Sequence, residues 1–95
     1  MTEFNLREYY LTQRHLIKMM DDVNDLCYRN RAEHRSTDDV SKKSLLDAEH
    51  QKLNDQFFKL AGEFESNALN KIQFHSDLND DELWNQIKEE TKNAK

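Results

Sequence analysis

The sequence contains no proline, one glycine and one cysteine among its 95 residues. β-Sandwiches, barrels and α/β folds need many turns, and turns recruit glycine and proline, so this scarcity excludes an all-β fold and nearly excludes an α/β fold. Cys27 is the single thiol, so neither a disulfide framework nor a thiolate metal site is expected. No apolar run approaches the ~18 residues that span a membrane. The first ten residues lack the basic and apolar regions of a secretory signal. We therefore expect a cytoplasmic protein that does not enter a membrane.

Charged residues make up 35% of the chain, with 14 basic and 19 acidic side chains and a net charge of −5. A non-specific nucleic-acid binder would be basic, so this balance argues against nucleic acid as a partner. Leucine, isoleucine, valine and phenylalanine total 21 residues. A single small domain with so few large apolar residues has a thin core, and a protein partner would complete it.

A seven-residue repeat predicts a first helix over about residues 3–31, with Thr2 as its N-cap. Gln13 and Asn30 occupy two core positions of the same register, and Tyr10 and Ile17 widen the apolar stripe. A short polar segment, residues 32–37, is expected to end the helix. The apolar members of the repeat are Leu6, Tyr9, Leu16, Met20, Val23 and Cys27.

A second helix is expected over about residues 37–74, because Ser36 and Asp39 form an acidic variant of the capping box. Gly62 costs roughly 1 kcal/mol relative to alanine inside a helix, and Ser66-Asn67 is a second weak point. Whether the helix breaks between residues 62 and 67 stays open. The expected core line consists of Leu46, His50, Leu53, Phe57, Leu60, Phe64, Ala68 and Ile72.

The clearest capping signal predicts a third helix over about residues 80–92. Asn79 is the expected N-cap, Glu82 reaches back to it, and Leu78 and Leu83 form the ends of a hydrophobic staple. The sequence thus predicts one all-α domain over residues 1–95. Its architecture is an antiparallel, coiled-coil-like hairpin of two helices followed by a short third helix.

The segment Arg29-Asn30-Arg31-Ala32-Glu33-His34 reads R-N-x-x-x-H, which resembles the active-site motif of HEPN ribonucleases. The resemblance implies that Arg29 stabilises an RNA phosphate and that His34 is the acid–base group, with Asn30 as the polar residue between them. It covers six residues, and the charged Glu33 stands where that family often has an apolar side chain. We favour the simpler interpretation that the arginines finish a helix, where cations complement the dipole.

A second short match is His15-x-x-Lys18, which resembles the H-x-x-K of histidine phosphotransfer domains and implies a phosphoacceptor role for His15. Met19 follows the lysine, where that family has a small residue, usually glycine. The four histidines show no i, i+4 pair, so no metal site and no cofactor are expected. His50 and Cys27 are expected to be packed core residues.

Three doublets, Tyr9-Tyr10, Met19-Met20 and Phe57-Phe58, place large side chains about 100° apart on their helices, so one two-helix seam cannot cover both members. Apolar helix faces in excess, together with the shortage of pocket-forming loops, indicate a non-enzymatic protein-binding module. The class includes an adaptor, a secretion or assembly chaperone, or a small inhibitor. A homodimer is the simplest assembly. The expected interface residues are Tyr9, Tyr10, Ile17, Phe57, Phe58 and Trp84.

Overall fold

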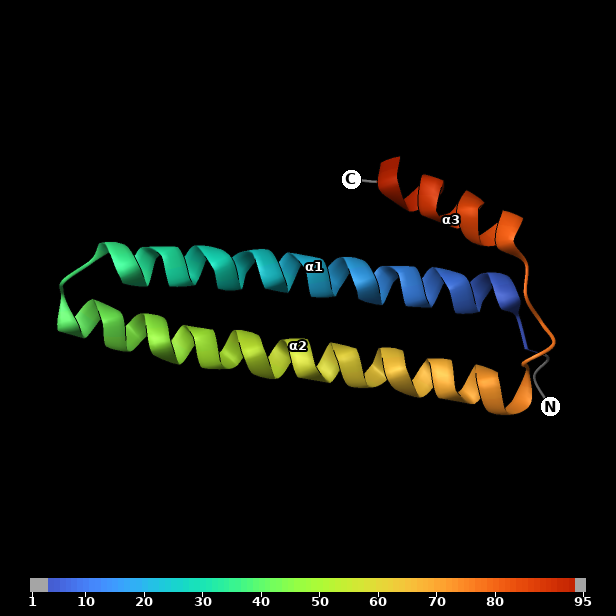
Figure 1. Cartoon of the computed structure of the whole chain (residues 1–95), viewed down its shortest axis with the longest axis horizontal. Helices are drawn as coiled ribbons and strands as arrows, with labels where there is room; N and C mark the ends of the chain where they lie inside the picture. The colour runs from blue at the N-terminus through green and yellow to red at the C-terminus, as the bar shows by residue number, and fades with distance from the viewer. Residues whose placement is uncertain (1–3, 94–95) are drawn as a thin grey trace.

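The computed structural model describes residues 4–93 and confirms the predicted architecture. Three helices follow one another, α1 (Leu6–Ser36), α2 (Val40–Phe74) and α3 (Asp81–Asn93), and no strand occurs between residues 4 and 93. Figure 1 shows α1 and α2 side by side in opposite directions, with α3 beside the open end of the hairpin on the α1 side. The molecule is elongated, with extents of 55 × 28 × 17 Å.

The first two helices begin at side-chain caps that differ from the expected ones. The Asn5 side chain accepts a hydrogen bond from the Glu8 backbone N–H, and Asp39 accepts from the N–H groups of Ser41 and Lys42. Thr2 lies outside the described residues. Ser36, expected to cap α2, is instead the last residue of α1. Because Asn and Asp cap helices as well as Ser and Thr do, several nearby residues compete for each start.

The end of α1 lies five residues beyond the expected one. Residues 32–36, expected as a polar connection, continue the helix, and only residues 37–39 join α1 to α2. Ala32, Glu33 and Arg35 favour helix, and neither glycine nor proline stands there to stop it. His34 and Arg35 in the last turn also complement the helix dipole.

Helix α2 is continuous through residues 62–67, so the weak points do not break it. Gly62 lies on the exposed side, and a Cβ built there meets no atom within 4 Å. On either side of it, Leu60 and Phe64 pack into the core. This tertiary packing outweighs the ~1 kcal/mol helix cost of one glycine.

The apolar core lies along the seam between α1 and α2. Its buried centre is Leu16, Val23 and Leu60, and the predicted repeat accounts for these three. Six partly buried side chains pack against them, Met19, Met20, Cys27, Leu53, Phe57 and Phe64. A single seam of this kind covers only one side of each helix.

The expected core line of α2 is wrong at its C-terminal end. Ile72 is 65% exposed, and Lys71 is buried in its place. The expected line moved from Phe64 to Ala68 and Ile72 in two steps of four residues. Lys71 lies seven residues after Phe64, so it is the position that continues the strict seven-residue repeat. Its Nζ donates to Asn79 Oδ1 at 2.9 Å and lies 5.9 Å from the centre of the Tyr9 ring.

The two polar core positions, Gln13 and Asn30, are buried and bond across the seam. Gln13 Nε2 donates to the Phe64 carbonyl oxygen, and Gln13 Oε1 accepts from Asn67 Nδ2, both at 3.1 Å. Asn30 Nδ2 donates to the Leu46 carbonyl oxygen at 2.9 Å. A register shift between the helices would leave these amides unpaired, so the two residues help to fix the alignment of α1 on α2.

The start of α3 is also capped differently from the expectation. Asp80 Oδ1 accepts from the Leu83 N–H at 3.0 Å, so Asp80 rather than Asn79 is the capping residue. Asn79 Nδ2 donates to the Ser76 carbonyl oxygen instead, and its Oδ1 receives the Lys71 ammonium. The lysine bond thus occupies the side chain that was expected to cap.

Helix α3 packs on α1 alone and does not pack on α2. Ile87 of α3 is fully buried. Arg14 Nε donates to Thr91 Oγ1 at 3.1 Å, and an exposed ion pair joins Arg7 to Glu90 at 3.0 Å. Because α3 is 13 residues long and α1 is 31, the third helix covers only the N-terminal part of α1 (Figure 1).

Candidate functional site

A groove opens between α3 and the hairpin, because α3 contacts α1 but not α2. We call it the tryptophan groove. It has a volume of about 220 Å³, and Trp84 of α3 faces Phe64 and Ala68 of α2 across it. Its other lining residues are Tyr9, Tyr10, Gln13, Ile17 and Asp81. The groove is mainly apolar, with a single carboxylate on its lining.

A second groove, the phenylalanine groove, lies nearer the loop end and has a volume of about 390 Å³. Phe58 and Tyr28 are about 70% exposed, which is unusual for large aromatic side chains. The rings of Phe57 and Phe58 meet edge to face at 6.2 Å. The remaining lining residues are Asn24, Cys27, Arg31, His50 and Asn54.

The two grooves follow one another along the same side of the hairpin. Tyr10 and Ile17 line the tryptophan groove, and Asn24 and Arg31 line the phenylalanine groove. These four residues are seven apart in turn, and residues seven apart lie on one line of a supercoiled helix. On α2, Phe57 and Phe64 repeat the relation, as do Asn54 and Ala68. We call this side, with its two grooves, the α3 flank.

All six expected interface residues line these two grooves, but they differ in accessibility. Phe58 is the most exposed. Tyr10 is buried, with its ring 5.2 Å from that of Trp84 and its hydroxyl accepting from the Asp80 N–H. Tyr10 therefore holds α3 in place. Tyr9, Ile17, Phe57 and Trp84 are half-buried, so each presents only part of its side chain to a partner.

Sequence reasoning missed Tyr28, Asn24 and Asn54 as lining residues of the α3 flank. The signal for Asn24 was present, since it continues the Tyr10–Ile17 spacing by one further step of seven. Tyr28 could have been found in the same way, because it lies 14 residues after Arg14, which contacts α3. Both side chains lie on the part of α1 that α3 leaves uncovered.

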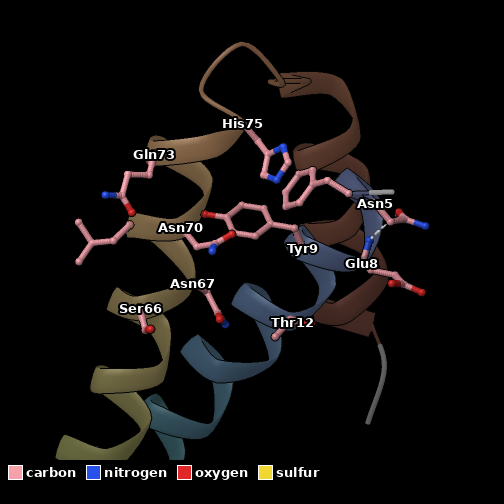
Figure 2. A pocket seen from close by; sticks show the side chains of 11 residues that line it. Asn5, Glu8, Tyr9, Thr12, Ser66, Asn67, Asn70, Gln73 and His75 are labelled. Atoms are coloured by element: carbon pink, nitrogen blue, oxygen red, sulfur yellow. Dashed lines mark hydrogen bonds between the residues drawn. The ribbon is translucent and has the colours of Figure 1, made fainter. Parts of the chain in front are cut away.

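A polar cleft of about 650 Å³ lies on the opposite side of the open end. Figure 2 shows its lining from the start of α1 and the end of α2, including Thr12, Ser66, Asn70 and Gln73. The Phe4 ring stacks on His75 at 4.0 Å and closes one end. Amides and hydroxyls dominate the lining, and no acid–base pair or nucleophile with a paired base is formed there.

Tyr9 lies between the two sides and shows the one resolved pKa shift of the described residues. Its pKa is raised from the ordinary value of 10.0, because burial disfavours the phenolate; a hydrogen bond with Gln13 opposes the rise and the neighbouring Tyr10 adds to it. A phenol whose pKa is 10.0 or above is neutral at physiological pH. Tyr9 therefore acts in the fold as a hydrogen-bonding aromatic residue.

The R-N-x-x-x-H residues point in different directions at the end of α1. Arg29 is exposed, whereas Asn30 is buried and bonded to Leu46. His34 Nε2 lies 3.3 Å from Asp47 Oδ1 of α2. Arg29 and His34 are five residues apart, or about 140° around the helix, so one chain does not bring them into a single cleft.

The other candidate residues are likewise separated. His15 is exposed on α1, as a phosphoacceptor would be. Cys27 and His50 both line the phenylalanine groove, where they are half-buried. Within residues 4–93, no group of three or more metal-binding side chains converges. No helix in that range combines the length and apolar character needed to cross a membrane.

Comparisons with protein-family models, with curated proteins and with solved structures found no match for this chain.

Proposed function

We propose that this chain is a non-enzymatic protein-binding module that receives an amphipathic helix along the α3 flank. The observation that carries the proposal is the continuity of the two grooves along one side of the hairpin, only part of which α3 covers. Exposed apolar residues scattered singly are ordinary, whereas aromatic side chains gathered in a groove mark an interaction site. Tyr28, Phe57 and Phe58 are such a group.

The shape of the flank suits a helix more than an extended peptide. A strand would need an open sheet edge to pair with, and the described residues form only helices. Ala61 and Ala68 are small and lie seven residues apart on α2, where they let a partner backbone approach the seam. Helix-in-groove binding then supplies apolar burial from residues spaced three and four apart on the partner.

An adaptor, a secretion or assembly chaperone, and a small inhibitor all work by this kind of contact, and we place the protein in that class, acting in the cytoplasm. The partner is either a second copy of the chain or a different protein with an apolar helix. The acidic net charge of −5 supports a protein partner over nucleic acid.

The test places a glutamate at each of two exposed apolar positions of α2, Phe58, which is 71% exposed, and Leu69, which is 60% exposed. Phe58→Glu places a carboxylate in the phenylalanine groove, and Leu69→Glu places one at the polar cleft on the opposite side. Each variant and the wild-type chain is used to purify partners from the native host, and each partner is then titrated as a pure protein. We expect Phe58→Glu to weaken binding at least about tenfold, because a buried unpaired carboxylate is costly. Leu69→Glu should bind as the wild type does.

Equal binding by all three chains would contradict the assignment of the α3 flank. Loss of binding by Leu69→Glu alone would move the site to the polar cleft. Because both positions are exposed, we expect both variants to fold. Circular dichroism of each variant checks that they do.

A further inference from the structure

We infer that the tryptophan groove binds a basic side chain, an arginine or a lysine, of the partner that occupies the α3 flank. The inference rests on the proposed function, because it uses the same flank, and it adds the chemistry by which the partner is recognised at the open end. Three features of the groove support it. They are its aromatic lining, the ammonium groups that already lie near its rings, and a carboxylate that has no bonding partner.

Aromatic side chains from all three helices line the tryptophan groove. Tyr9 and Tyr10 come from α1, Phe64 from α2 and Trp84 from α3. The rings of Tyr9 and Tyr10 lie 5.7 Å apart at 50°, and those of Tyr10 and Trp84 lie 5.2 Å apart at 57°, so neighbouring rings are tilted and do not stack face to face. The face of an aromatic ring is electrostatically negative, and several rings around one space attract a cation.

Two rings of this lining already lie near ammonium groups of the chain itself. Lys88 Nζ is 5.8 Å from the centre of the Trp84 ring, and Lys71 Nζ is 5.9 Å from the centre of the Tyr9 ring. Both distances fall within the ~6 Å at which a ring face attracts a cation. Neither lysine lines the groove, so the groove itself holds no positive charge of the chain. These contacts show that the rings of this lining are placed where cations can approach them.

Asp81 gives the groove a negative charge. Of the eight residues that line the groove, it alone is charged, and its side chain is exposed. Within residues 4–93, its carboxylate forms neither an ion pair nor a hydrogen bond. The N–H of the preceding residue, Asp80, donates to the Tyr10 hydroxyl at 3.1 Å and so holds the start of α3 beside the aromatic lining. A carboxylate is therefore fixed next to four aromatic rings and is available to pair with a cation.

The volume and charge of the groove suit one basic side chain. The groove measures about 220 Å³, which is less than the ~300–1,000 Å³ of pockets that take drug-sized ligands. An apolar side chain in it would bury part of the Asp81 carboxylate without a partner, which is costly. The guanidinium group of arginine both stacks on aromatic rings and pairs with a carboxylate. No carboxylate lines the phenylalanine groove, so we assign the basic residue of the partner to the tryptophan groove.

A titration with small probes tests the site in the full chain. Trp84 is the single tryptophan, so its fluorescence reports on the groove directly. The probes are Nα-acetylarginine amide, Nα-acetylcitrulline amide, which has nearly the same shape but no charge, and tetramethylammonium as a free cation. Asp81→Asn is compared with Glu82→Gln. Glu82 is the next residue, lies in the same first turn of α3, is also exposed, and does not line the tryptophan groove.

We expect the arginine probe to change the Trp84 emission saturably at millimolar concentrations, as a single side chain without its helix should. The citrulline probe should bind at least about fivefold more weakly, because it lacks the charge. Asp81→Asn should weaken binding of the arginine probe at least about threefold, and Glu82→Gln should change it by less than about 1.5-fold. The comparison of the two probes needs no variant, so the test stays decisive if Asp81→Asn folds poorly.

Equal binding of the arginine and citrulline probes, equal effects of the two substitutions, or no saturable change with the arginine probe would each overturn the inference. Tetramethylammonium that binds more than about tenfold more tightly than the arginine probe would overturn the assignment to a side chain of the partner, since a free cation would then be the better ligand. The proposed function fails separately. A chain that ignores the arginine probe but loses a host partner on Phe58→Glu remains a binding module, whereas a chain that binds the probe but loses no partner keeps only the cation site.

Discussion

Asn30 offers a direct test of whether the R-N-x-x-x-H segment is built for the fold. Its side chain is 2% exposed and makes four contacts within hydrogen-bond distance. Nδ2 donates to the Leu46 carbonyl at 2.9 Å and to Glu49 Oε1 at 3.3 Å. Oδ1 accepts from Arg31 Nε at 2.9 Å and Arg31 Nη2 at 2.6 Å. Asn30→Ala removes all four.

The magnitude follows from what the alanine leaves behind. The Leu46 carbonyl keeps a bond from Arg31 Nη2 at 3.3 Å, and the arginine keeps Asp47 Oδ1 at 3.2 Å, so neither group becomes wholly unpaired. Loss of a buried amide under these conditions should lower the free energy of unfolding by about 2 kcal/mol. Arg29→Ala, at the exposed neighbouring position, should change it by less than about 0.5 kcal/mol.

Urea denaturation followed by circular dichroism measures both variants, and the denaturant slope checks that unfolding remains two-state. If the free energy of unfolding of Asn30→Ala lies within about 0.5 kcal/mol of the wild-type value, the claim that this residue fixes the helix register is refuted. A loss at Arg29 as large as that at Asn30 would show that the face assignment of the end of α1 is wrong.

Three further predictions concern single positions. Gly62→Ala should raise the free energy of unfolding by about 0.5–1 kcal/mol in urea denaturation, since the added methyl group meets no atom within 4 Å and alanine favours helix; an unchanged or lower stability would mean that α2 is strained there. Tyr9 should ionise above its ordinary pKa of 10.0 in a titration of phenolate absorbance. The stability that its neutral form contributes below pH 10 should be lost as pH rises through the raised pKa, and Tyr9→Phe should flatten that decline; identical titration of wild type and Tyr9→Phe would contradict the assignment. Wild type should cleave neither structured nor unstructured RNA above background, because His34 pairs with Asp47 away from Arg29; cleavage that disappears in His34→Ala would instead establish the ribonuclease.

The hairpin could be predicted from the sequence because one physical rule determines it. Apolar side chains every three and four residues must be buried, and Leu16, Val23 and Leu60 satisfy that rule on two helices. Gln13 and Asn30 could be placed in the core from the same spacing. Their buried amides then required partners, which the Phe64 and Leu46 carbonyl groups supply.

The helix ends and the packing of α3 could not be predicted in the same way. Thr37, Asp38 and Asp39 follow Ser36, and all of these residue types cap helices, so the sequence does not choose among them. The choice of α1 over α2 as the support for α3 depends on contacts such as Tyr10 with Trp84, which join residues far apart in the chain.

The candidate site was predictable as a set of residues but not as a surface. The doublet Phe57-Phe58 indicated that one two-helix seam could not bury both side chains. That Tyr10 becomes buried, while Tyr28 stays exposed in the same flank, depends on where α3 ends. The burial of Lys71 was likewise not predicted, because lysine is seldom buried unless its charge is paired. Here Asn79, from the connecting segment, pairs the ammonium group.

Side-chain footprinting in the native host tests the central claim most directly, because it works whether or not the partner has been identified. Hydroxyl-radical labelling of Tyr28 and Phe58 is compared with labelling of Leu45 and Leu69, since all four are at least 60% exposed in the isolated chain. If a partner binds the α3 flank, Tyr28 and Phe58 should be protected in host lysate relative to dilute pure protein, while both leucines are labelled equally in the two. Protection of the leucines with Tyr28 and Phe58 still labelled, or no protection at any of the four positions, would contradict binding through the α3 flank.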